Sequence, residues 1–305
     1  MKFFKKRENL VEAIAFMAMF AAINALFCVL ASFFPLGGLI VLFVVPLTSM
    51  VVALFCKDLH YLIYLGASIP LCILSSFADI SSAIFYAIPG LFTGGLFGIL
   101  LKRKAPLYIN LFACGVIEFL FFLLELPIIK ATLSIDMKSG LLSFFRLSEN
   151  EFATLSFFGF MALYTMVEMT LISIFALSIL PRLGIDKPKA NLIHAPAIFA
   201  SALSISGFII GFFNMEVAFV FLAYSLFWCI ILIKDEFQAL SWVYLIASGT
   251  IFLLCFIFFA IGFTYDKTHG LNYLNLFPLG IALIGAIRSL FLLRKARSET
   301  KILKP

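Results

Sequence analysis

The class of this protein is indicated by one stretch of its sequence, Leu107-Tyr-Ile-Asn-Leu-Phe-Ala-Cys-Gly-Val-Ile-Glu118-Phe-Leu-Phe-Phe-Leu-Leu-Glu125-Leu-Pro-Ile-Ile129. It is long enough to cross a bilayer as a helix, because a span needs about 20 mostly apolar residues. It also carries two carboxylates seven residues apart, which a helix presents on one face. No lysine or arginine lies within the stretch to neutralise them. Two acids in hydrocarbon cost free energy and therefore point to a functional site.

The composition is that of an integral membrane protein. Of the 305 residues, 64% are hydrophobic and 12% are charged, and the mean hydropathy is +1.14. A soluble domain of this length could not hide so much apolar surface from water. The net charge of +6 comes from short basic clusters between apolar runs, which act as topology determinants and do not indicate nucleic-acid binding. The six cysteines lie in or beside apolar runs without a CxxC pair, and we interpret them as packing residues.

The sequence predicts an all-α, polytopic transmembrane bundle. Ten apolar runs are long enough to span, at about residues 10–33, 37–56, 60–78, 82–101, 107–129, 153–180, 193–213, 216–233, 239–263 and 273–293. The polar stretch from Lys130 to Glu151 is the one substantial loop of this scheme. Gly90, Gly94 and Gly98 recur at intervals of four in the fourth run, which favours close helix packing.

The distribution of basic residues predicts the orientation. With the N-terminus in the cytoplasm, 17 of the 22 basic residues fall on the cytoplasmic side. Only Lys130, Lys138, Arg146 and Lys267 fall on the opposite side, and Arg288 lies near the cytoplasmic end of the last span. Because lysine and arginine accumulate in cytoplasmic loops, both termini are predicted to be cytoplasmic.

The polar residues of the spans are the candidate binding residues. Glu118 and Glu168 each lie near the middle of a predicted span, and Glu125 lies about 10 Å nearer the outer surface. Asn24 and Asn110 add uncharged polar groups. These five side chains could bind a cation, a proton or a small ligand with hydrogen-bond donors. Alternatively, each glutamate is protonated and bonded to a backbone carbonyl or a neighbouring hydroxyl or amide group.

No pattern in the sequence indicates an enzyme. The three histidines lie at predicted span edges or in a loop, away from the glutamates, so no metal site or cofactor is expected. The HExxH, GxSxG and GxxxxGK[ST] motifs do not occur in the sequence. Without a nucleotide-hydrolysing motif, active transport would need a partner protein or an ion gradient.

Four segments carry a resemblance to known membrane proteins. Two of them are Glu12-Ala-Ile-Ala-Phe-Met-Ala-Met-Phe-Ala-Ala-Ile-Asn24 and Ala87-Ile-Pro-Gly-Leu-Phe-Thr-Gly-Gly-Leu-Phe-Gly98. These two segments are similar to segments of the substrate-binding (S) components of energy-coupling factor transporters. The other two are Leu177-Ser-Ile-Leu-Pro-Arg-Leu-Gly-Ile-Asp-Lys-Pro188 and the closing segment Ala282–Lys295. They resemble the uncharacterised YybS-type membrane family, which we associate with the superfamily of the S components. S components usually have six spans, so four spans here are additional. Arg288 also stands where the family commonly has an acidic residue.

The resemblance implies a function and an organisation. Residues 1–180 would form a six-helix S-component-like module, and residues 181–305 a four-helix extension with a basic tail. The protein would reside in a bacterial cytoplasmic membrane and capture a small, vitamin-like molecule for import with partner ATPases, with the Lys130–Glu151 loop as a lid. Ala18 and Ala22 would dock on the transmembrane coupling subunit. The alternatives are a non-transporting scaffold protein and a stand-alone ion-coupled carrier; the internal repeat that many carriers show is not evident in this sequence.

Overall fold

The computed structural model describes residues 5–34, 37–77, 80, 83–134, 136–144, 151–186, 195–238 and 271–287, together with scattered positions between 246 and 264. These residues form helices and no strands. A single isolated bridge pairs Arg7 with Cys56. The predicted all-α class is therefore confirmed for the part of the chain described.

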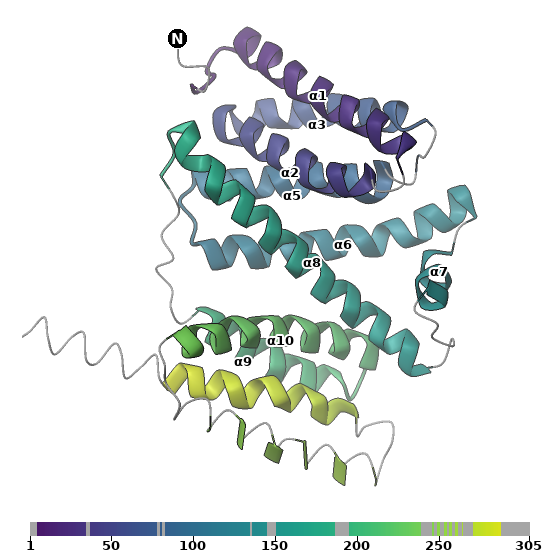
Figure 1. The fold of residues 1–305 in the computed structure, drawn as a ribbon, viewed down its shortest axis with the longest axis vertical. Helices are drawn as coiled ribbons and strands as arrows, with labels where there is room; N and C mark the ends of the chain where they lie inside the picture. The colour runs from purple at the N-terminus through teal and green to yellow at the C-terminus, as the bar shows by residue number, and fades with distance from the viewer. Residues whose placement is uncertain are drawn as a thin grey trace, which may run out of the picture. The chain divides into compact units, whose positions relative to one another are not determined.

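Figure 1 shows the helices in chain order. They are α1 (Leu10–Phe33), α2 (Gly37–Phe55), α3 (Asp58–Ser75), η1 (Ala83–Ala87), α5 (Ile88–Lys102), α6 (Leu107–Leu133), α7 (Met137–Phe144), α8 (Glu151–Ile179), η2 (Leu180–Leu183), α9 (Ala195–Ile210), α10 (Met215–Gln238) and η3 (Leu271–Asn275). The helical segment that η3 opens continues to Ile287.

Seven segments of the described chain are long and apolar enough to cross a membrane. They are Leu10–Phe33, Gly37–Phe55, Asp58–Ser75, Ala83–Lys102, Leu107–Thr132, Phe157–Leu183 and Met215–Leu232. The segments Ala195–Ile210 and Leu271–Ile287 are apolar but shorter. Most of the predicted span at 239–263 lies outside the described residues. The chain is thus a multi-pass membrane protein that contacts the lipid bilayer, and the count of ten spans stays a prediction.

Packing groups the chain into two units. The first contains Met1–Phe144 and Thr165–Ala190, and the second contains Phe145–Tyr164 and Asn191–Pro305. The second half of α8 therefore belongs to the first unit, which also holds α6. The predicted boundary at residue 180 stays a prediction.

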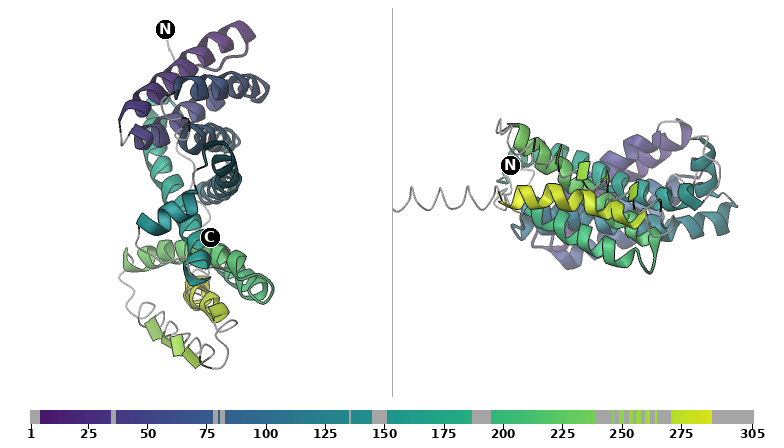
Figure 2. Two further views of the ribbon diagram at one scale, coloured as in Figure 1. Left: turned by 90° about the vertical axis from the view of Figure 1, so that its right-hand side faces the viewer. Right: turned by 90° about the horizontal axis from the view of Figure 1, so that it is seen from below.

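In the first unit, α1, α2, α3 and α5 lie side by side (Figures 1 and 2). Glycines of α5 allow the closest of these contacts. A Cβ atom on Gly94 would overlap the carbonyl oxygen of Pro46 in α2, and one on Gly98 would lie 2.6 Å from the carbonyl oxygen of Met50. The backbones of α2 and α5 therefore touch, as small residues permit in membranes. The predicted packing role of the glycine series is confirmed.

A short π-helix, η1, precedes α5 and is explained by Pro89. Proline has no N–H group, so Pro89 cannot donate the regular helical hydrogen bond to the carbonyl oxygen of Phe85. The chain passes through the wider turn at Ala83–Ala87 and enters α5 with Pro89 in its first turn, where the missing donor costs least. Such π-turns are frequent at functional sites.

The predicted loop from Lys130 to Glu151 is partly helical, which corrects that expectation. Helix α6 runs past Pro127 and ends only at Leu133, with Ser134 in the left-handed conformation. Lys130 donates a hydrogen bond of 2.7 Å to Oδ2 of Asp136, and Asp136 accepts the backbone N–H of Ser139 at 3.2 Å. This carboxylate begins α7 as an N-cap, so the polar stretch contains a second helix.

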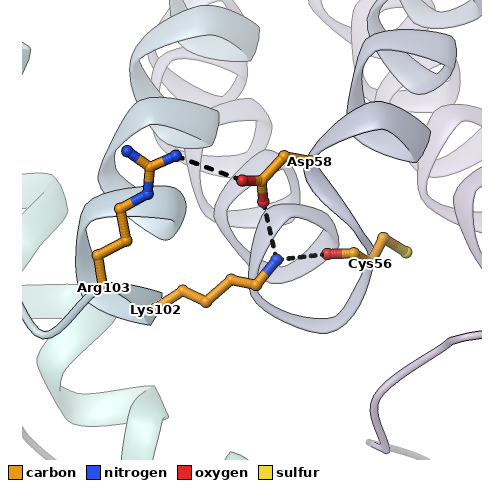
Figure 3. A network of polar contacts seen from close by, with 4 residues as sticks. All are labelled: Cys56, Asp58, Lys102 and Arg103. Atoms are coloured by element: carbon orange, nitrogen blue, oxygen red, sulfur yellow. Dashed lines mark hydrogen bonds and ion pairs between the residues drawn. The ribbon is translucent and has the colours of Figure 1, made fainter.

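Basic residues collect at one end of the first unit (Figure 3). Lys102 donates hydrogen bonds to the carbonyl oxygen of Cys56 and to Asp58, and Arg103 reaches the other oxygen of Asp58. The backbone N–H of Arg7 donates to the carbonyl oxygen of Phe55 at 2.7 Å. Burial raises the pKa of the Cys56 thiol to about 11. The segment before α1, the α2–α3 turn and the end of α5 thus lie together at one end of the bundle, and the cytoplasmic orientation of this end stays a prediction.

The second unit contains α9, α10 and the segment from Leu271 to Ile287, which pack on one another. Asparagines fasten this contact. The Asn272 amide donates to the carbonyl oxygen of Phe208 at 2.6 Å, and the hydroxyl of Ser204 donates to the carbonyl oxygen of Asn275. A Cβ atom on Gly207 would collide with the side chain of Asn275, so glycine is required for this close approach.

Candidate functional site

The candidate site is built on α6, the helix that carries Glu118 and Glu125. A separation of seven residues places both on one face, with a rise of about 10 Å between their Cα atoms. Phe122 lies between them on the same face, four residues after one carboxylate and three before the other. The face thus presents acid, aromatic ring and acid in succession.

Both carboxylates are buried and incompletely bonded. Glu118 is 8% exposed and Glu125 is 4% exposed. Oε2 of Glu118 and Oε1 of Glu125 have no hydrogen-bond partner. Buried polar atoms are nearly always bonded, since leaving one unpaired costs about 1–3 kcal/mol and more for a charged group. These two oxygen atoms make Glu118 and Glu125 the candidate binding residues of α6.

Helix α5 supplies the polar neighbour of Glu118. The carboxyl group contacts the side chain of Thr93, which is fully buried. The Thr93 hydroxyl donates to the carbonyl oxygen of Pro89 at 2.8 Å, and the thiol of Cys114 contacts the carbonyl oxygen of Thr93 at 3.7 Å. Glu118 and Cys114, which lie four residues apart on α6, therefore both contact Thr93 of α5.

Aromatic rings supply the rest of the surroundings. The ring of Phe122 lies 5.9 Å from that of Phe85 in η1, edge to face, and 6.4 Å from that of Phe119. Phe85 in turn contacts Tyr86 at 5.2 Å. Both Phe122 and Phe119 are buried. The π-helical turn thus brings an aromatic group onto the face of α6 that carries the two acids.

Glu168 is a buried residue of α8. It is 7% exposed. One turn before Glu118, Gly115 receives Met166 of α8 so closely that a Cβ atom on the glycine would collide with the methionine sulfur. Figure 1 shows α8 crossing α6. Glu118 and Glu168 each lie within one helical turn, along the chain, of this contact, and their predicted common depth in the membrane stays a prediction.

Asn24 and Asn110 have different surroundings. Asn24, fully buried, donates to the hydroxyl of Tyr64 at 2.7 Å and accepts from the hydroxyl of Thr48 at 2.6 Å. Its bonds join α1 to α2 and α3 and are complete without a ligand. Asn110 lies in the first turn of α6, where its amide reaches the carbonyl oxygen of Ala105 at 3.5 Å and its Oδ1 atom has no partner. Of the five predicted residues, Glu118 and Glu125 thus share one face of α6, and the convergence of the five on one site stays a prediction.

Ala18 and Ala22, the predicted docking residues, lie on an exposed face of α1. Val11 and Leu26 are exposed on the same helix. This apolar face is open to lipid or to a partner helix.

Within the described residues, no ion pair joins a basic side chain to Glu118 or Glu125. Between their terminal turns, the seven spans contain no lysine or arginine. The ion pairs of the described residues lie at helix ends, as those of Lys102 with Asp58 and Lys130 with Asp136 do. No group of three or more histidine, cysteine, aspartate or glutamate side chains gathers within the described ranges to hold a metal ion.

Sequence reasoning missed two residues of the site, Thr93 and Phe122. A threonine in an apolar span and one phenylalanine among 39 carry little signal of their own. The spacing of Phe122 between the two glutamates was the available clue.

The chain matches no family model, no curated protein and no solved structure. The function must therefore be argued from the site itself.

Proposed function

We propose that this membrane protein is the substrate-binding component of a transport system, which captures a small molecule at the α6 carboxylates for import. One observation carries the proposal: Oε2 of Glu118 and Oε1 of Glu125 are buried without a partner. A ligand with hydrogen-bond donors or positive charge would satisfy both atoms. Ionisable groups held at membrane depth commonly mark substrate or ion pathways.

Protonation alone explains less of this geometry. A proton on each glutamate would remove its charge, but a carboxylic acid still needs an acceptor for its O–H group and donors for its lone pairs. The unpartnered oxygen of each glutamate has neither. A bound molecule would remove both the charge imbalance and the hydrogen-bond deficit.

The energy for import would come from partner subunits. The sequence contains no nucleotide-hydrolysing motif, so we assign ATP hydrolysis to separate ATPases joined through a transmembrane coupling subunit. The exposed face of α1 around Ala18 and Ala22 is our proposed docking surface for that subunit. The basic end of the first unit would face the cytoplasm of a bacterial cell, with both termini on that side.

Uptake measurements test the proposal. The protein is isolated from its native host in mild detergent, and co-purifying small molecules and subunits are identified by mass spectrometry. We expect a ligand in the wild type that is lost from Glu118→Gln and Glu125→Gln, with uptake by cells falling at least tenfold. Glu12→Gln is the matched control, because the Glu12 side chain is 46% exposed and bonded to Arg7. Full uptake by the Glu118→Gln, Glu125→Gln double variant would contradict the proposal.

The docking surface is tested separately. Replacing Ala18 and Ala22 by tryptophan should release the partner subunits while ligand binding persists. A stable complex with a membrane protein lacking any ATPase or coupling subunit would instead identify a scaffold.

The same unpartnered carboxylates also suit a carrier that works alone with an ion gradient. Proteoliposomes that contain only this chain distinguish the two functions. Ligand accumulation driven by a proton or sodium gradient would establish the carrier. No accumulation without partner subunits supports the transport component.

A further inference from the structure

We infer that the ligand of the α6 site is a linear organic cation with an ammonium group at each end, a diamine. This inference rests on the proposed function and names the class of its substrate. Three features carry it: two unpartnered carboxylate oxygens, their separation along one helix, and the aromatic ring between them.

The charge of the ligand follows from the charges of the spans. Glu118 and Glu125 are each more than nine-tenths buried, and the spans bring no lysine or arginine to them between the terminal turns. Buried ionised carboxylates are tolerated when paired with positive charge. An ammonium group provides that charge together with three N–H donors. A ligand with these groups would satisfy an unpartnered oxygen and neutralise its carboxylate at once.

The separation of the two acids favours two ammonium groups over one. Their Cα atoms are displaced by about 10 Å along the axis, whereas an N–H···O hydrogen bond joins heavy atoms about 2.9 Å apart. One ammonium group therefore serves one carboxylate, and a second group is needed for the other.

The ring of Phe122 accounts for the middle of the ligand. It lies between the acids on the same face of α6 and contacts Phe85 of η1 and Phe119. Methylene groups pack on such rings, and ammonium groups are attracted to the ring faces. A small metal ion would find few oxygen ligands beside these rings, because hard cations such as Ca²⁺ and Mg²⁺ take six or more. The surroundings therefore fit an organic cation.

Calorimetry of the purified full-length chain in lipid nanodiscs tests the inference. The probes are α,ω-diaminoalkanes with three to eight carbons, each compared with the monoamine of equal length, in fixed sodium chloride. We expect one diamine length to bind best and at least tenfold more tightly than its monoamine. Glu118→Gln and Glu125→Gln should each reduce this preference to less than threefold, and Glu118→Asp should restore part of it.

Two further variants examine the aromatic contact and the fold. Phe122→Leu should weaken diamine binding about threefold, as expected for loss of a cation–π contact. Phe20→Leu, at a buried position of α1, is the matched control and should leave affinity unchanged. Circular dichroism and gel filtration confirm that each variant is folded.

The outcomes separate this inference from the proposed function. Equal binding of monoamines and diamines would overturn the inference. So would binding of sodium alone, or a co-purified neutral or anionic ligand that Glu118→Gln releases; that last result would leave the proposed function standing. Diamine binding with the expected variant effects, but without any loss of uptake in the double variant, would overturn the proposed function alone.

Discussion

The ammonium nitrogen of Lys102 lies 2.8 Å from Oδ1 of Asp58 and fastens the last turn of α5 to the first turn of α3. The same nitrogen donates to the carbonyl oxygen of Cys56 at 2.9 Å, just beyond the end of α2. One side chain therefore joins three helices at the basic end of the bundle and satisfies a carbonyl that a helix end leaves free.

Replacing Lys102 by methionine should lower the free energy of unfolding by about 1 kcal/mol, the upper part of the range for exposed ion pairs. Arg103→Met is the matched control. The Arg103 side chain is 69% exposed and lies 3.5 Å from Asp58, so its loss should cost only a few tenths of a kcal/mol. Denaturant titration in mild detergent measures both values. Equal losses would contradict the capping role of Lys102.

Gly94→Ala should disrupt the contact between α5 and α2. The added methyl group would overlap the carbonyl oxygen of Pro46, a backbone atom that cannot move aside. We expect a loss of at least 2 kcal/mol, within the range for overpacked cores. Gly66→Ala in α3 is the control, because nothing lies within 4 Å of its added atom. That change should stabilise the helix by about 0.5–1 kcal/mol. Melting temperatures in detergent would reveal the opposite signs.

The ion pair between Asp136 and Lys130 should be lost at low pH. The hydrogen bond from Lys130, together with that from the backbone N–H of Ser139, lowers the pKa of Asp136 to about 2. Because the unfolded value is about 3.9, the stabilisation is complete above about pH 4 and is lost as the pH falls toward 2. The protection of amide protons in the α6–α7 connection, which is the intrinsic exchange rate at each pH divided by the measured rate, should therefore decrease across that interval.

Two variants separate the charge of Asp136 from its capping role. Asp136→Asn keeps a side-chain acceptor for Ser139 but removes the ion pair. The protection of the amide protons should therefore no longer change between about pH 4 and pH 2, while α7 persists. Asp136→Ala removes the cap as well and should fray α7 at every pH. Unchanged pH dependence in Asp136→Asn would assign the effect to another group.

Tyr64→Phe should destabilise the first unit without altering the ligand site. The change removes the acceptor of the Asn24 amide and leaves a fully buried donor unpaired, at a cost of about 1 kcal/mol. The double variant with Asn24→Ala should lose less than the sum of the two single changes. Ligand binding should remain at the wild-type level. If Tyr64→Phe instead lost ligand binding at unchanged stability, Asn24 would have to be counted among the ligand-binding residues.

Local sequence patterns predicted the membrane spans and the close packing of α5. They did not predict where α6 ends or that α7 forms. Runs of apolar residues located the seven spans, and the spacing of Gly90, Gly94 and Gly98 predicted the close packing of α5. The end of α6 was placed too early because the polar residues after Ile129 look like a loop, although a helix leaving the membrane can continue in water. Helix α7 was missed for the same reason.

The candidate site shows the same division. Glu118 and Glu125 were predicted because charged groups in apolar runs stand out in any single sequence. Asn24 was selected on equal grounds, but α2 and α3 complete its hydrogen bonds. Thr93 and the ring of Phe85 were not predicted, since only the packing of η1 and α5 against α6 brings them beside the acids.

The sequence by itself determined that this chain is a helical, multi-pass membrane protein with acids inside its spans. Hydropathy and helical periodicity are local properties, and in hydrocarbon a chain must satisfy its backbone within each helix. Tertiary structure alone decided which polar groups are paired and which are left unpartnered. Pairing depends on side chains from different helices meeting in space, as Thr93 meets Glu118 and Tyr64 meets Asn24.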